Sequence, residues 1–142
     1  MVVFRLAREE YAIPIAQVKE IIRFQSATKL PNMPGYMEGI INLRGKVLPV
    51  IDLAGKFVLQ TEKRLEKQAL IVELGGKEMG LVVDSVTEVL RIDETAMEAA
   101  GTIAQTNRFI RAIGKVADRL LIILDLDTLF TAEETVTIQA AG

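Results

Sequence analysis

The chain has 142 residues, half of them apolar, with 17 basic and 19 acidic side chains and a formal net charge of −2. A balance so close to neutral provides no bulk field that would attract nucleic acid or an anionic membrane. The chain contains no cysteine and no histidine, so disulfides, thiol nucleophiles and the usual general base near neutral pH are missing. We therefore expect a protein without catalytic activity, cofactor or metal.

Short β-rich runs separated by turn-forming residues open the chain. VVFRL (2–6), YAIPI (11–15) and KEIIRF (19–24) come first, and an irregular stretch, 25–35, follows. No apolar run approaches the roughly 20 residues that span a bilayer, and no signal peptide is recognisable. These features predict a mainly β, cytoplasmic protein without membrane insertion.

A strand, a tight turn and a second strand follow around Gly45, and Asp52 is placed to cap a short helix that ends at Phe57. After the charged stretch QTEKRLEKQ (60–68), the chain returns to β-rich runs. It then passes through a polar, partly helical excursion, 93–107, and reaches a second strand–turn–strand. There Asp118 is expected at the turn, as glycine and aspartate both suit a positive φ.

The chain repeats itself. Residues 2–24 align without a gap on 70–92, and 35–57 align on 108–130, with five identities in each block. The identical pairs are Leu6/Leu74, Glu10/Glu78, Val18/Val86, Glu20/Glu88 and Arg23/Arg91, then Ile40/Ile113, Leu48/Leu121, Asp52/Asp125, Leu53/Leu126 and Phe57/Phe130. Several short strands at close spacing, twice over, predict two small β-barrels. We place repeat 1 at approximately 1–59, repeat 2 at approximately 68–131 and a short tail at 132–142.

Arg44 stands in the apolar run GIINLRGKVLPVIDL, where a core has no favourable place for a guanidinium. Its repeat mate is Ala117, so the architecture does not require arginine at this turn. The general interpretation of an arginine beside a hairpin glycine is a solvated side chain. Glu20 and Glu88 are likewise interpreted as exposed carboxylates.

Two acidic patterns have alternative interpretations. Asp125 and Asp127 share a spacing that could hold a divalent cation, although a helix cap is the stronger interpretation. Asp84 and Glu88 could be drawn as a glycosidase pair, but a chain with 19 acidic residues offers many such pairs.

The stretch EGIINLRGKVLPVIDL (38–53), preceded by YAIPIAQVKEII (11–22) and LPNMPGYM (30–37), resembles the CheW-type coupling proteins of chemotaxis. MGLVVDSVTEVLRI (79–92) and RLLIILDLDTLF (119–130) continue the resemblance over nearly the whole chain. It implies a single CheW-like domain of two tandem five-stranded SH3-like β-barrels with short helices.

The resemblance also implies a function. It is that of a stand-alone, non-catalytic adaptor that couples chemoreceptor cytoplasmic tips to the regulatory domain of the histidine kinase CheA in membrane-receptor arrays. The alternative is an SH3-like module that binds another helical or peptide partner outside chemotaxis.

Six residues are implied as partner contacts. Arg44 would meet carboxylates or helix-end carbonyls of the receptor tip through its planar set of donors, and apolar side chains would take the receptor helix. For Val18 and Val86, plain core is an equally open interpretation. The full set is Arg44, Leu43, Ile15, Val18, Glu20 and Val86.

Overall fold

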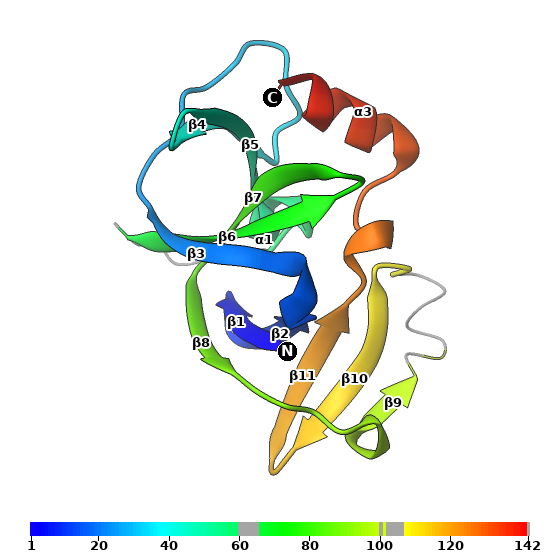
Figure 1. Ribbon diagram of the computed structural model, residues 1–142. Helices are drawn as coiled ribbons and strands as arrows, with labels where there is room; N and C mark the ends of the chain where they lie inside the picture. The colour runs from blue at the N-terminus through cyan, green and yellow to red at the C-terminus, as the bar shows by residue number, and fades with distance from the viewer. Residues whose placement is uncertain (60–65, 100, 102–106, 142) are drawn as a thin grey trace.

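The computed structural model describes residues 1–59, 66–99, 101 and 107–141, and shows a mainly β protein with two sheets and a few short helices (Figure 1). The five-stranded sheet has the order β3 (Val18–Phe24), β6 (Lys67–Leu74), β7 (Lys77–Val83), β5 (Lys46–Asp52) and β4 (Met37–Leu43). The six-stranded sheet has the order β8 (Ser85–Val89), β1 (Val2–Leu6), β2 (Glu9–Ile13), β11 (Arg119–Leu124), β10 (Ile110–Val116) and β9 (Met97–Ala99). The predicted mainly β class is confirmed.

The helices are short and lie between or after the strands. Among the described residues they are η1 (Ile15–Gln17), α1 (Leu53–Lys56), η2 (Glu94–Ala96), η3 (Leu126–Thr128) and α3 (Ala132–Ala141). In the part of the chain that the structure describes, no helix is long and apolar enough to cross a membrane. The expected excursion at 93–107 contains η2 and β9, which is the outermost strand of the six-stranded sheet. Its residues 100 and 102–106, like 60–65 of the charged stretch, lie outside the described residues.

Each sheet takes strands from both repeats. The first hairpin of the chain, β1–β2, belongs to the six-stranded sheet with β8–β11, whereas β6–β7 belongs to the five-stranded sheet with β3–β5. When repeat mates replace one another, the order β3-β6-β7-β5-β4 becomes β8-β1-β2-β11-β10. The sheets are therefore related by the sequence repeat, and the first hairpins are exchanged between them.

The main core lies between the two sheets and belongs to both. Repeat mates occupy equivalent places in it: Ile13 and Leu81 are both fully buried, and Phe4 and Val72 are at most 1% exposed. Burial of each such side chain stabilises the fold by roughly 1.5–3 kcal/mol. Each sheet also has one smaller apolar cluster of its own, around Val50 in the five-stranded sheet and around Ile123 in the six-stranded sheet. Because the central core is shared, the sheets are expected to unfold together.

Asp84, between β7 and β8, links the β1–β2 hairpin to the point where the chain passes from one sheet to the other. It is only 7% exposed, its carboxylate accepts the N–H of Ala7 at 2.8 Å, and its own N–H donates to the Arg5 carbonyl at 3.0 Å. Ala7 has φ +55°, a left-handed turn conformation that this bond helps to hold. The repeat mate of Asp84 is Ala16, so the contact exists in one half only.

Asp84→Ala is expected to lower the free energy of unfolding by about 1.5–3 kcal/mol, because the Ala7 N–H loses a charged acceptor. Asp84→Asn keeps an acceptor oxygen and should cost clearly less. Urea unfolding of the two variants measures the difference. Equal losses would show that the hydrogen bond is not what Asp84 contributes.

The two aspartates predicted to cap short helices behave differently. Asp125 accepts the N–H of Asp127 at 3.0 Å and caps η3, which confirms that interpretation. Asp52 occupies the equivalent position before α1 but makes no capping hydrogen bond with its side chain, so the prediction was wrong for Asp52. Its carboxylate lies close to Gly55 instead.

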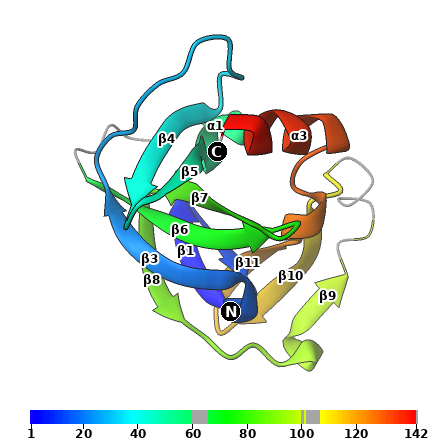
Figure 2. The same ribbon diagram turned by 45° about the horizontal axis from the view of Figure 1, so that its top comes forward.

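Residues 132–141, expected as a tail, form helix α3, which lies across the five-stranded sheet (Figure 2). A capping box starts the helix: Thr131 Oγ1 accepts the N–H of Glu134 at 3.1 Å, and Glu134 Oε1 accepts the N–H of Thr131 at 2.9 Å. Glu134 also accepts from Lys56 Nζ at 2.7 Å, and Ile138 is fully buried. The helix is thus fixed at its start by charge and near its end by burial.

Acid is expected to weaken the attachment of α3. Burial raises the pKa of Glu134, but hydrogen bonds from Lys56 and from the Thr131 N–H outweigh it and hold the pKa at about 2, below the ordinary 4.5. Because the folded pKa is the lower one, this stabilisation is complete above the unfolded pKa and is lost as the pH falls toward about 2. NMR signals of Ile138 followed down this range should shift, and Glu134→Gln should abolish that step. An unchanged profile in the variant would contradict the assignment to Glu134.

Candidate functional site

Arg44 lies at the tip of the β4–β5 hairpin. Leu43 pairs with Lys46, so Arg44 and Gly45 form a two-residue loop with φ +51° and +85°. This pair of positive φ values is typical of a type I′ turn, for which glycine is favoured. The Asn42 side chain accepts the Gly45 N–H at 2.9 Å and stabilises the loop. The loop therefore holds an arginine in a backbone conformation that arginine seldom adopts.

The equivalent hairpin, β10–β11, has its left-handed residue in a different place from the one expected. Ala117 has φ +54°, and Asp118 does not have a positive φ. The turn predicted at Asp118 is confirmed, but its positive φ is not: the two hairpins share the left-handed conformation only at the first loop residue, Arg44 and Ala117.

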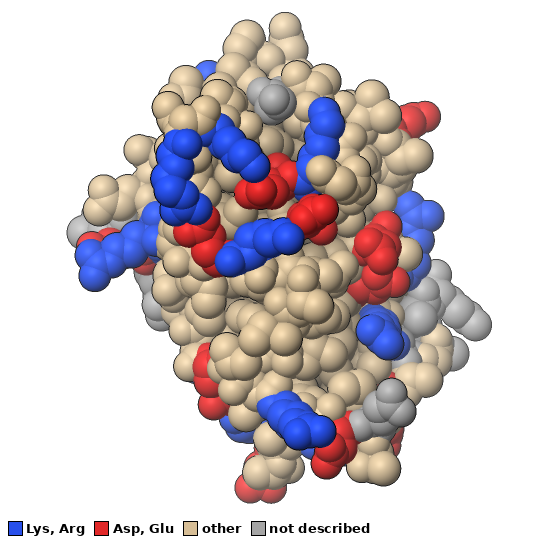
Figure 3. All heavy atoms as spheres, viewed as in Figure 1, with Lys and Arg blue, Asp and Glu red and all other residues tan. Residues whose placement is uncertain are grey.

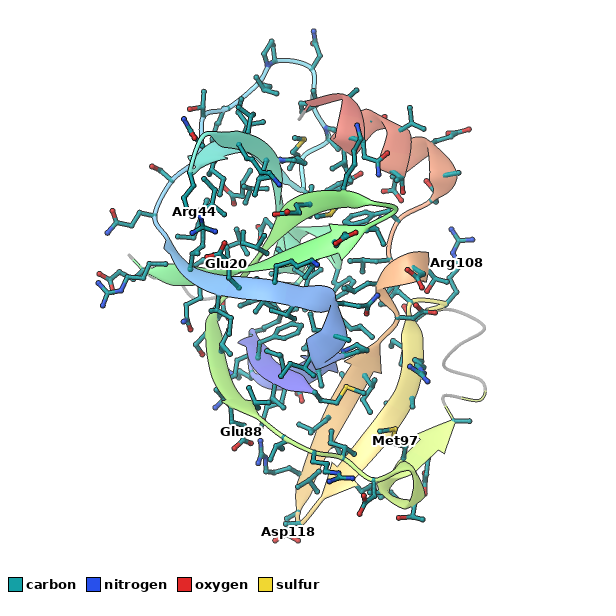
Figure 4. All side chains as sticks on the ribbon, in the orientation of Figure 1. Glu20, Arg44, Glu88, Met97, Arg108 and Asp118 are labelled. Carbon is teal, nitrogen blue, oxygen red and sulfur yellow. The ribbon has the colours of Figure 1, made fainter. Side chains whose placement is uncertain are left out.

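The guanidinium of Arg44 forms a two-pronged ion pair with Glu20 on β3 (Figure 4). Nη1 donates to Oε2 at 3.2 Å, and Nη2 donates to Oε1. The hydrogen bond from Arg44 lowers the pKa of Glu20, and Glu20 raises that of Arg44. The Arg44 side chain nevertheless remains 70% exposed, so donors are left for a partner. Two residues predicted separately as contacts are thus brought together.

Two further ion pairs lie at the same end of the five-stranded sheet. Lys19 pairs with Glu73 at 3.0 Å, and Lys46 pairs with Glu78 at 3.1 Å. In Figure 3 blue and red side chains alternate across the upper part of the face, above a central area without charge. Exposed pairs of this kind contribute little stability, but they define a polar border.

Apolar side chains lie on the outer strands β3 and β8. Val18 and Val86 are half-buried and pack against the core between the sheets, and Ile15 on η1 is 54% exposed. The Gln68 side chain, on the strand beside β3, accepts the Val86 N–H at 2.6 Å. β3 and β8 therefore contribute to one region of the surface, and Val18 and Val86 serve both as core and as surface.

Leu43 is the last residue of β4, next to Arg44. It is half-buried and lines a hollow of about 400 Å³ between the end of β3 and strand β4. The hollow is lined by residues 22–28 and 40–43. Among the six predicted contacts, Leu43 is thus the one that lines this hollow.

The chain matches known proteins over nearly all of its length. The profile of the CheW-like domain family matches residues 1–134. The chain belongs to the CheW-like family. It is 36% identical over 138 residues to the chemotaxis protein CheW of Bacillus subtilis (strain 168), covering 95% of this chain and 88% of that protein. Against the chemotaxis protein CheW of Klebsiella aerogenes, it is 35% identical over 135 residues, covering 93% and 81%.

A solved relative has the same fold. The scaffolding protein TtCheW from Thermoanaerobacter tengcongensis superposes with a TM-score of 0.85 and 41% identity, covering 94% of this chain and 92% of that one. The resemblance read from the N-L-R-G stretch is therefore confirmed. These names support a role as an adaptor in chemotaxis.

Two further exposed apolar residues on β3 and β8 were not predicted as contacts. Ile21 and Val89, which are repeat mates on β3 and β8, are 40% and 57% exposed. Ile21 pairs with Leu70 and Val89 with Val2, both buried residues of the shared core. The alignment places an apolar residue at this position in both repeats, which could have suggested a shared apolar surface. It does not show that these two side chains are exposed.

The carboxylates Glu20 and Glu88, expected to be exposed, lie on the outer strands β3 and β8, and both also form ion pairs that were not predicted for Glu88 or between Glu20 and Arg44. Glu20 pairs with Arg44, and Glu88 accepts from Arg119 Nη2 at 2.5 Å. Their side chains are 29% and 37% exposed. The carboxylate of Asp84 accepts a hydrogen bond from the Ala7 N–H, and that of Asp125 accepts one from the Asp127 N–H. No group of three or more potential metal ligands occurs among the residues described.

Proposed function

We propose that this CheW-like protein is a non-catalytic adaptor that couples chemoreceptor cytoplasmic tips to the regulatory domain of CheA. The supporting observation is the juxtaposition of apolar side chains on β3 and β8 with the exposed guanidinium of Arg44. An amphipathic helix places its apolar face on such a surface and its carboxylates against the arginine.

Coupling then requires differential contacts. The adaptor holds receptor and kinase in one assembly, and a receptor state that binds it differently shifts the kinase equilibrium by that difference in free energy. The regulatory domain of CheA is proposed to dock barrel on barrel, a head-to-tail contact that can close into rings. Single contacts can be weak in such an assembly, because many are made at once.

Titration of the isotope-labelled protein with a chemoreceptor tip hairpin tests the receptor contact. Signals around Val18, Val86 and Arg44 are expected to shift in the wild type, and Arg44→Glu is expected to bind at least tenfold more weakly because it opposes the partner's carboxylates. Arg44→Gly is the matched variant: it removes the side chain and relieves the left-handed backbone, so binding should fall while the fold is kept.

Two results would change the conclusion. If Arg44→Gly bound as well as the wild type, Arg44 would be a solvated turn residue. If the wild type showed no shifts, the protein would instead be a β-barrel module for another helical or peptide partner outside chemotaxis.

A further inference from the structure

The apolar surface on β3 and β8 has an internal twofold pseudo-symmetry. Val18 on β3 is the repeat mate of Val86 on β8, and Ile21 is the mate of Val89. Both strands are outer strands of their sheets, at equivalent positions in the strand order. For an apolar helix face, these four side chains are therefore arranged nearly alike in two opposite directions, and they do not define which direction a bound helix takes. Ile15 is outside this symmetry, because its repeat mate Val83 is only 1% exposed.

Both ends of the pseudo-symmetric arrangement carry a guanidinium–carboxylate pair. Glu20 and Glu88 are repeat mates, and each accepts from an arginine at a hairpin tip. Arg44 donates to Glu20 from the β4–β5 hairpin, and Arg119 donates to Glu88 from the β10–β11 hairpin. Figure 4 shows Arg44 and Glu20 in the upper part of the molecule and Glu88 and Asp118 in the lower part. Asp118 precedes Arg119 in the chain.

The two arginines differ in how many donors they have left. Arg119 donates from Nε and Nη2 to Glu10, at 3.1 and 2.5 Å, and from Nη2 to Glu88, and its side chain is 37% exposed. Arg44 pairs with a single carboxylate through Nη1 and Nη2 and is 70% exposed. Both guanidiniums keep N–H donors, including the two on Nη1 of Arg119, but their charge balance differs. Arg44 faces one carboxylate, whereas two carboxylates share Arg119, so negative charge is in excess at that end.

The asymmetry has a specific origin in the sequence. The repeat mate of Arg119 is Lys46, which pairs with Glu78, the mate of Glu10. Each half thus has a cation for the carboxylate on the exchanged hairpin, but the first half has Arg44 in addition. The second half has Ala117 at that place, with nearly the same φ, +54° against +51°.

We propose that Arg44 sets the direction of the bound helix, so that the carboxylate-bearing end of the helix lies against the β4–β5 hairpin. Arg119 competes poorly, because Glu10 and Glu88 together carry more charge than the one guanidinium between them, and an incoming carboxylate there would meet two like charges. This inference rests on the proposed function and adds the orientation of the partner.

The test moves the arginine from one end to the other. In the variant Arg44→Ala, Ala117→Arg both changed positions keep their left-handed backbone, and the net charge is unchanged. The probe is a chemoreceptor tip hairpin with one nitroxide at its carboxylate-bearing end. Val47 and Leu120 are the reporters, because they are repeat mates on the two hairpins and are 47% and 61% exposed. The nitroxide broadens the amide signals nearest to it.

In the wild type, the Val47 signal is expected to lose more intensity than that of Leu120. In the double variant this ratio is expected to reverse. As a second variant, Glu10→Gln in the wild-type background removes one of the carboxylates on Arg119, and should bring additional broadening at Leu120.

Each other outcome has a distinct meaning. Binding with the ratio unchanged in both variants, or with equal broadening at both hairpins in the wild type, would overturn the directional proposal and leave the adaptor function standing. Absence of any shift in the wild type would overturn the adaptor function and the directional proposal together.

Discussion

A fragment that ends after the first repeat, residues 1–66, is expected to remain unfolded in isolation. It contains β1–β5, but β1 and β2 pair with β8 and β11 of the second half, and β3 and β5 pair with β6 and β7. The fragment therefore lacks the two strands in the middle of its own sheet, and its share of the central core has no partner surface. Strands without a sheet to join are not stable alone in water.

Mixing the fragment with residues 67–142 is expected to restore the fold, because the two pieces together contain every strand. Circular dichroism and amide NMR dispersion of each piece and of the mixture measure this. The informative comparison is a fragment of similar length, 14–83, which contains all five strands of the five-stranded sheet in one stretch. It should retain more β structure than 1–66. A well-folded 1–66 fragment would contradict the exchange of hairpins.

Gly39→Ala is expected to lower the free energy of unfolding by roughly 3–5 kcal/mol. A Cβ at Gly39 would lie 2.1 Å from the Thr28 carbonyl oxygen, and the residue has φ +139°. The clash falls on backbone atoms of the bridge between Thr28 and Ile40, whose two hydrogen bonds are both 2.9 Å long. Relief would require this bridge to open, since no flexible side chain can move aside.

Gly35→Ala is the matched control, because nothing lies within 4 Å of a Cβ built there. Its effect should stay within about 0.5 kcal/mol. Urea unfolding of both variants gives the two values, and a loss at Gly39 no larger than at Gly35 would contradict the clash. The repeat mate of Gly39 is Ala112, which pairs with Ala99 of β9. The second half tolerates a methyl group there because a regular strand lies alongside.

Local patterns in the sequence determined the class of fold and the family. Alternating β-rich runs, turn residues and the two repeat blocks predicted a mainly β duplicated fold, because these signals depend on neighbours along the chain. The family came from a resemblance that rests on several stretches, the N-L-R-G stretch among them. Arg44 stood out because an arginine in an apolar run is unusual for the residue types around it.

Partners across the repeat were decided by the tertiary structure alone. The exchange of the first hairpins joins segments that lie far apart in the chain, and so do the bonds of Arg119 to Glu10 and Glu88. The exposure of Ile21 and Val89 also depends on how such distant segments pack. The repeat aligned Glu20 with Glu88, and in the structure each accepts from an arginine. The alignment did not show this for Glu88, because the repeat mate of Arg44 is Ala117. The arginine at position 119 reaches Glu88 instead, and only the packing of β8 beside the rest of its sheet shows that.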